Sequence, residues 1–144
     1  MATVKKQLRE EFGLIKSYPS TVIDYEGSGL LGITIRIEAK GPASGLRINN
    51  VSRGEFLIID SSRLKAIAGR DISLGDVIII KTGKGEKSVT LSRDGTSYNI
   101  LHAIDTSSKW IYLQHGPNEF TVTAEQNLDN LFIQVNYQQK VLGI

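Results

Sequence analysis

Apolar and polar residues alternate along much of the chain, which is the pattern of half-buried β-strands. The clearest run is Gly32–Lys40, where one face carries Ile33, Ile35, Ile37 and Ala39, and the other carries Thr34, Arg36, Glu38 and Lys40. A strand with one apolar and one polar face is typical of an antiparallel sheet that packs on a core on one side and meets water on the other.

Further short strands are predicted along the rest of the chain, separated by turns rich in Gly, Pro, Asp and Ser. They begin near Thr21 and include Leu46–Val51, Phe56–Ile59, Val77–Ile80, Lys87–Arg93, Ser97–Ile104, Lys109–Leu113, Glu119–Ala124 and Leu131–Tyr137. Roughly nine or ten strands at this spacing predict an all-β antiparallel sandwich. The uniformly apolar Val77–Ile80 suggests a strand covered on both faces. One short helix is predicted over Ser61–Ala68, with serine at its start and Gly69 after its end.

The N-terminal segment has a different pattern. Within Thr3–Ser17, four apolar residues recur at helical spacing, namely Val4, Leu8, Phe12 and Ile15. Gly13 interrupts the stripe, and Pro19 ends whatever precedes it. We therefore divide the chain into an N-terminal arm or linker at residues 1–19, helical or extended, and a β-sandwich at residues 20–144.

The stretch Lys81–Asp94, KTGKGEKSVTLSRD, superficially resembles a phosphate-binding loop. Such a loop needs glycine directly before its lysine and opens a helix, whereas Glu86 precedes Lys87 and an alternating strand follows. The stretch is predicted to be a hairpin, with Asp76–Thr82 leading out, Gly83–Glu86 as the loop and Lys87–Arg93 returning. Asp94-Gly95 supplies the next tight turn, and the basic run is interpreted as a solvated hairpin.

Composition narrows the function classes. The chain has 144 residues, a formal net charge of +2 and no cysteine. This charge is too small to indicate nucleic acid, and the absence of cysteine excludes disulfides and thiolate chemistry. The longest apolar run is Val77–Ile80, far too short to span a membrane.

Candidate catalytic and metal-binding groups are sparse. His102 and His115 stand thirteen positions apart, without the partners of a zinc site. Most acids are assigned to turns: Asp24, Asp76, Asp94 and Asp105. Paired carboxylates of the glycosidase type stay open, since any two strands can bring acids together. No catalytic, metal-binding or cofactor-binding residue is predicted, and no binding residue can be assigned.

Aromatic residues leave a second function class open. Trp110, with Tyr112 and Tyr98, lies near predicted strand ends and could form a sugar-stacking platform. Because Ile111 and Leu113 flank it, Trp110 is interpreted as a core anchor instead. Full burial predicts a loss of about 3–5 kcal/mol on truncation to alanine. These residues leave a carbohydrate-binding module that adheres to a cell wall as the alternative function.

Residues 75–144 closely resemble the C-terminal domain of siphophage distal tail proteins, the siphovirus-type tail component family. The resemblance rests on GEKSVTLSRDGTSYNI, IDTSSKWIYLQHGPNEFTVTAE and NLFIQVNYQQKVLGI, and extends more weakly back to about residue 20. The matching positions are Gly75, Asp76, Lys87, Val89, Thr90, Leu91, Arg93, Gly95, Asn99, Ile100, Trp110, Leu113, Gly116, Asn118, Tyr137, Leu142, Gly143 and Ile144.

The resemblance implies a galectin-like β-sandwich and a non-enzymatic structural role at a phage tail tip or baseplate, or in a prophage tail-like particle. It implies a homo-hexameric ring in the virion tail, assembled in the bacterial host cytoplasm. The implied partners are the tail tube, the tail-associated lysin and receptor-binding proteins. The family's N-terminal belt domain has no counterpart in residues 1–19, so we expect either a fragment or a short relative that assembles differently.

Overall fold

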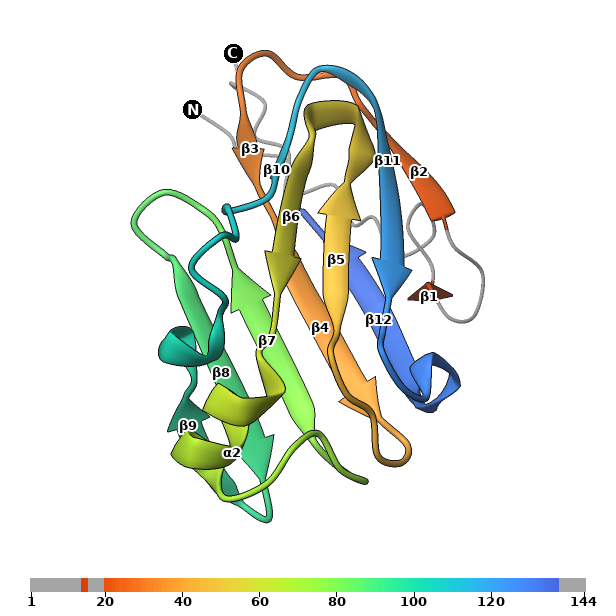
Figure 1. Cartoon of the computed structure of the whole chain (residues 1–144). Coiled ribbons are helices and arrows are strands. Elements are labelled where there is room, and N and C mark those ends of the chain that lie inside the picture. The colour runs from red at the N-terminus through yellow and green to blue at the C-terminus, as the bar shows by residue number, and fades with distance from the viewer. Residues whose placement is uncertain (1–13, 16–19, 138–144) are drawn as a thin grey trace.

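The computed structural model describes residues 14–15 and 20–137, which form two facing antiparallel sheets and a helical cover (Figure 1). The strands are β1 (Leu14–Ile15), β2 (Ser20–Tyr25), β3 (Leu31–Gly32), β4 (Thr34–Ala39), β5 (Arg47–Asn50), β6 (Glu55–Ile58), β7 (Val77–Lys81), β8 (Ser88–Arg93), β9 (Thr96–Asn99), β10 (Tyr112–Leu113), β11 (Gly116–Thr123) and β12 (Leu131–Asn136). The helices are α2 (Ser61–Ala68) and the 3₁₀ turns η1 (Val51–Arg53), η2 (Leu101–Ala103) and η3 (Leu128–Asn130). The predicted all-β sandwich is confirmed.

The larger sheet has the strand order β1-β12-β4-β7-β8-β9. Its centre is β4, the strand with the clearest alternation, whose burial pattern follows the alternation without exception. Ile35 and Ile37 are fully buried and pair with Val135 and Ile133 on β12. The period-2 pattern therefore fixed both the strand and its inward face, as a half-buried strand requires.

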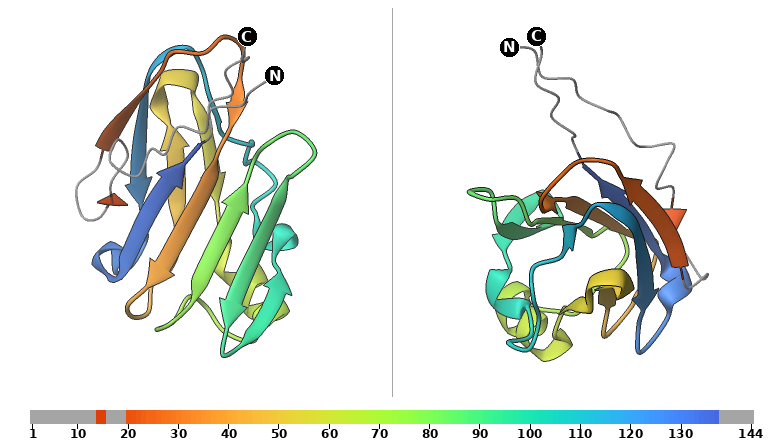
Figure 2. Two further views of the ribbon diagram at one scale, coloured as in Figure 1. Left: turned by 180° about the vertical axis from the view of Figure 1, so that it is seen from behind. Right: turned by 90° about the horizontal axis from the view of Figure 1, so that it is seen from above.

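The smaller sheet has the order β2-β11-β5-β6 and faces the larger one (Figure 2). Phe120 on β11 points inward and is fully buried, as is Ile48 on β5. Their neighbours Glu119 and Asn49 lie on the outer face, since side chains alternate along a strand. A two-stranded ladder, β10-β3, joins the sandwich at one end.

The smaller sheet does not reach across the whole of the larger one, and α2 with η2 covers the remainder beside β7, β8 and β9 (Figure 1). Leu64 and Ala103 are buried under this cover. Helix α2 has the predicted bounds, but its N-cap is Asp60, which accepts a hydrogen bond from the Arg63 N–H at 2.9 Å. Gly69 ends the helix with φ 90°, a conformation that favours glycine.

Two hairpins of the larger sheet follow the sequence prediction. β7 pairs with β8 through the loop predicted at Gly83–Glu86, and β8 pairs with β9 through Asp94 and Gly95. Those two residues have φ values of 52° and 77°, as a tight hairpin turn requires.

Several strand predictions were wrong in detail. Strand β7 alternates between buried and half-buried residues, so Val77 and Ile79 are not covered by a second layer. Their outer face is flanked by β4 and β8. The strand predicted at Ser97–Ile104 ends at Asn99, two residues before η2, and the one at Lys109–Leu113 is reduced to β10.

The N-terminal arm lies almost entirely outside the described residues, and so do Val4, Leu8 and Phe12. Leu14 and Ile15 are described and pair with Gln134 and Ile133 of β12. These two residues are extended, so the helical alternative does not hold for them. The division at residue 20 stays a prediction.

Candidate functional site

Arg93 lies at the end of β8 and is buried, with 2% of its surface exposed. Its Nε donates to Asp76 Oδ1 at 2.9 Å, and its Nη2 donates to Asp76 Oδ2. The hydrogen bonds that Arg93 donates to the Asp76 carboxylate raise the pKa of Arg93 above its already high value. Both residues were assigned wrongly from the sequence, Arg93 to a solvated hairpin and Asp76 to a simple turn.

The remaining guanidinium protons hold the chain that follows α2. Nη1 donates to the carbonyls of Ala68 and Arg70 at 3.0 Å each, and Nη2 donates to the carbonyl of Asp71 at 2.8 Å. All five N–H donors of Arg93 are thereby used, which is the full capacity of the side chain. We call Arg93, Asp76 and these three carbonyls the arginine clamp.

The arginine clamp fixes the turn that leads into β7. Asp76 Oδ2 also accepts from the Ser73 N–H at 2.8 Å, and Gly75 adopts φ 89° beside it. Leu74 at the tip of this turn is 70% exposed. The Gly75-Asp76 motif and the arginine therefore shape one surface loop, and no group of the clamp is left free for chemistry.

A second buried cluster surrounds Asn118 on β11. Its Nδ2 donates to the carbonyls of Gln114 and Gly116 at 2.9 Å and lies 3.3 Å from that of Ile23. Its Oδ1 accepts from the Gln114 N–H at 3.0 Å and from Asn50 Nδ2 at 3.2 Å. Asn118 is fully buried and ties the turn before β11 to the neighbouring strands.

The aromatic residues proposed for sugar stacking do not form one platform. Tyr98 lies on β9 and packs against the core, at the opposite end of the molecule from β10, which carries Tyr112 (Figure 1). Lys87 Nζ lies 5.6 Å from the centre of the Tyr112 ring. Trp110 is half-buried and packs against the core from an irregular segment.

We expect Trp110→Ala to lower the free energy of unfolding by about 2–3 kcal/mol, less than full burial would give, because part of the indole stays in water in the folded state. Denaturant titration with intrinsic tyrosine fluorescence or circular dichroism measures the change. An unchanged midpoint would show that the indole contributes nothing to the core, and would return Trp110 to the candidates for ligand stacking.

Among the described residues, the histidines and the other acids do not form a metal site. His102 and His115 are both exposed, and His115 Nδ1 lies 3.1 Å from the Gly27 carbonyl. Among the described residues, no group of three or more His, Cys, Asp or Glu could hold a metal ion. Asp24 lies on strand β2 and not in a turn. Asp105 accepts two hydrogen bonds from Ser107, which lower the pKa of its carboxyl.

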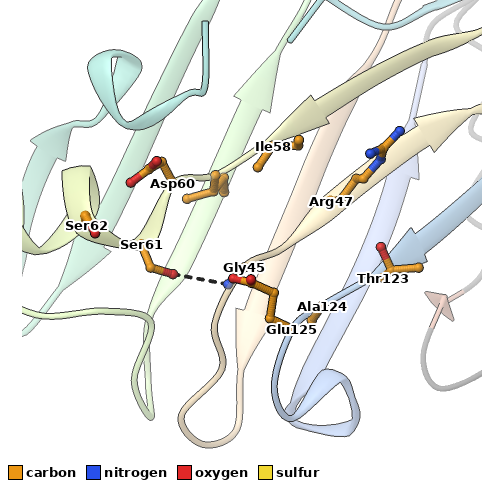
Figure 3. A pocket seen from close by; sticks show the side chains of 10 residues that line it. Gly45, Arg47, Ile58, Asp60, Ser61, Ser62, Thr123, Ala124 and Glu125 are labelled. Carbon is orange, nitrogen blue, oxygen red and sulfur yellow. Dashed lines mark hydrogen bonds between the residues drawn. The ribbon is translucent and has the colours of Figure 1, made fainter. Parts of the chain in front are cut away.

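A pocket of about 430 Å³ lies where the smaller sheet meets the start of α2 (Figure 3). Two acids line it, but Figure 3 shows the Asp60 carboxylate directed toward α2 and that of Glu125 directed toward Gly45. Gly45 beside it has φ 67°, a left-handed conformation that favours glycine. The two carboxylates do not face a common position, as a glycosidase pair must.

Arg47 borders the same pocket, but its guanidinium does not pair with the carboxylates of Asp60 or Glu125. Its guanidinium lies over the Phe56 ring, 4.3 Å from the centroid, and its Nε donates to Asn49 Oδ1 at 2.8 Å. Figure 3 shows this side chain directed away from the pocket centre.

The described residues also include no helix long and apolar enough to cross a membrane.

Comparison with protein families matches residues 26–140 to the siphovirus-type tail component, C-terminal domain. Neither curated proteins nor solved structures gave a match. The matched region contains both the arginine clamp and the Asn118 cluster. The last three residues that carried the resemblance, Leu142, Gly143 and Ile144, lie beyond the matched region and outside the described residues.

Proposed function

Because the chain belongs to the siphovirus-type tail component family, we propose that it is a non-enzymatic structural module of a phage tail tip or baseplate, or of a prophage tail-like particle. It docks neighbouring tail proteins through its sandwich surfaces and loops. The partners are the tail tube, the tail-associated lysin and receptor-binding proteins. The chain is made and assembled in the host cytoplasm and resides in the virion tail.

One observation carries this proposal, namely the family match over most of the chain. The use of the motif residues supports it. Arg93, Asp76 and Asn118 are buried, and their hydrogen bonds go to backbone groups and other side chains of the same chain. Residues of this kind hold surface loops in place, which is what an assembly module needs.

The test is the location of the chain in assembled particles. Antibody labelling of purified tails under the electron microscope should place it at the end distal to the head, and quantitative mass spectrometry should give six copies per tail. Particles that lack the chain, or that carry it in the capsid, would refute the proposal.

We expect the isolated chain to be monomeric or weakly associated at micromolar concentration, and to join a six-fold ring only in the particle. The outer face of the larger sheet is mostly polar, with Arg36 and Glu38 on β4 and Thr90 on β8. Lasting interfaces usually bury more than about 1,000 Å² in total with a largely apolar centre.

Light scattering across a concentration series measures the oligomeric state of the isolated chain. A stable hexamer would show that the sandwich itself, or its N-terminal arm, carries the ring contacts. The proposed separation between a monomeric module and a particle-borne ring would then be wrong.

A further inference from the structure

Strand β2 is an edge strand of the smaller sheet. It bonds to β11 on one side, and in the part of the chain that the structure describes no strand pairs with its other side. Figure 1 shows it at the outer margin of the sheet, beside β11. An unpaired edge presents a row of backbone N–H and C=O groups on which an extended chain can form another strand.

The opposite edge of this sheet is covered. Residues 103–109 run along β6, where the Asp105 N–H donates to the Ile58 carbonyl at 2.9 Å and the Lys109 N–H donates to the Phe56 carbonyl at 2.8 Å. In the larger sheet the described edge strands are shorter, two residues in β1 and four in β9. With six residues, β2 is the longest edge left open among the described residues.

Asp24 is the one charged side chain on β2 that faces solvent at this edge. Proteins commonly blunt an open edge with lysine, proline or a bulge. The strand reads Ser-Thr-Val-Ile-Asp-Tyr, without lysine or proline, and its register with β11 runs without interruption. Ser20, Val22 and Asp24 are exposed, and Val22 keeps 54% of its surface in water.

The surface around this edge is acidic. Asp24 lies on β2, Glu26 follows the strand, and Glu119 lies directly across from Val22 on β11. Among the described residues none of the three carboxylates forms an ion pair. A strand that carries lysine or arginine would complement them, whereas a second copy of β2 would bring the same acids together.

We propose that the edge of β2 binds an extended, basic segment of a neighbouring tail protein as an added strand. The segment bonds to the backbone of Ser20–Tyr25, places an apolar side chain beside Val22 and pairs a lysine or arginine with Asp24. Only the assignment of the partner to the tail rests on the proposed function.

The probe is an octapeptide in which threonine alternates with valine and lysine, Thr-Val-Thr-Lys-Thr-Val-Thr-Lys. Heteronuclear NMR on the full chain should show shifts and slowed amide exchange confined to β2 and its neighbours. Two control peptides separate the contributions: one replaces lysine with glutamate, and the other is N-methylated at alternate amides, which removes backbone donors and keeps the charge. Each should bind at least tenfold more weakly.

Val22→Lys places a charge on the edge that opposes strand addition. We expect this variant to bind the probe peptide at least tenfold more weakly. The matched control is Ser92→Lys, at an exposed position of the other sheet, which should leave binding unchanged. Circular dichroism must show both variants folded.

Three results would overturn the proposal. Equal binding of the N-methylated peptide would show electrostatic adhesion without a strand, and absence of binding would show that the edge is closed to extended segments. A dimer of the parent chain that Val22→Lys dissolves would make a second copy the occupant. None of these results depends on where the chain lies in the particle, so each is distinguishable from failure of the proposed function.

Discussion

Replacing Arg93 with alanine should lower the free energy of unfolding by about 3–5 kcal/mol, enough to unfold a marginally stable domain. The variant leaves the Asp76 carboxylate buried without its cation. It also leaves the carbonyls of Ala68, Arg70 and Asp71 without a donor. Removing one partner of a buried pair costs far more than the pair itself contributes, because the remaining charge cannot regain water. Chemical denaturation followed by circular dichroism measures the loss.

Two further variants separate the clamp from a general effect of charge. Arg93→Lys keeps the charge but cannot reproduce the five-donor fork, so it should still cost at least about 1.5 kcal/mol, one hydrogen bond to a charged group. Arg70→Ala removes an ion pair with Asp94 whose side chains are 51% and 76% exposed. That variant should cost less than about 1 kcal/mol. Equal losses for Arg93→Ala and Arg70→Ala would contradict the clamp.

Asn118→Ala should lower the free energy of unfolding by about 2–4 kcal/mol, because several backbone groups lose their partner inside the protein. The carbonyls of Gln114 and Gly116 lose a donor, and the buried Nδ2 of Asn50 loses one acceptor. The turn before β11 depends on these bonds, so we also expect amide exchange to become faster there than elsewhere in the chain.

The aspartate variant adds a pH signature to this prediction. Asn118→Asp turns a carboxylate toward the same carbonyls, and burial raises its pKa in the folded protein above the unfolded value of about 3.9. The excess destabilisation is therefore complete above the raised folded pKa, declines as the pH falls through that pKa, and is gone once the pH is below the unfolded value. Asn49→Ala, which removes a bond to Thr121 on the outer face, is the matched control and should cost less than about 1 kcal/mol. If Asn118→Ala lowered the free energy of unfolding by no more than Asn49→Ala does, water would have replaced the hydrogen bonds of Asn118.

The sequence was sufficient to predict features that depend on residues close to one another in the chain. The alternation of β4 predicted its strand and its buried face, and Asp94-Gly95 predicted the tight turn between β8 and β9. Helix α2 was predicted with its observed bounds, although the capping residue proved to be Asp60. Each of these features depends on residues within a few positions of one another.

The sequence was insufficient where distant residues decide the outcome. Asp76 and Arg93 are seventeen positions apart and look like turn and surface residues in the sequence. In the structure they form a buried ion pair. Asn118 bonds to the carbonyl of Ile23, ninety-five positions away. The strands predicted at Ser97–Ile104 and Lys109–Leu113 are both shorter in the structure, and the segment between β9 and β10 runs along β6 in irregular form. Tertiary pairing overrides local propensity in such cases.

The candidate site could be predicted only at the level of the family. The motif order indicated a siphovirus-type tail component, which the family match confirms. Which surface meets a partner could not be predicted, because Asp76, Arg93 and Asn118, three of the polar motif residues, are buried. The open edge of β2 could not be predicted either, because a sequence pattern indicates a strand but not whether both of its sides are hydrogen-bonded.

The pairing of the first strands with the last has a consequence for how the chain reaches its fold. Strand β4 needs β12 beside it, and Val135 pairs with Ile35 one hundred residues earlier. Strand β2 likewise waits for β11. Closing loops of this length costs conformational entropy before the contacts between the paired strands can stabilise the chain. Such topologies therefore fold slowly. On the ribosome, β4 is synthesised long before its partner emerges, and its apolar face stays exposed meanwhile. The chain is therefore most vulnerable to aggregation during its own synthesis.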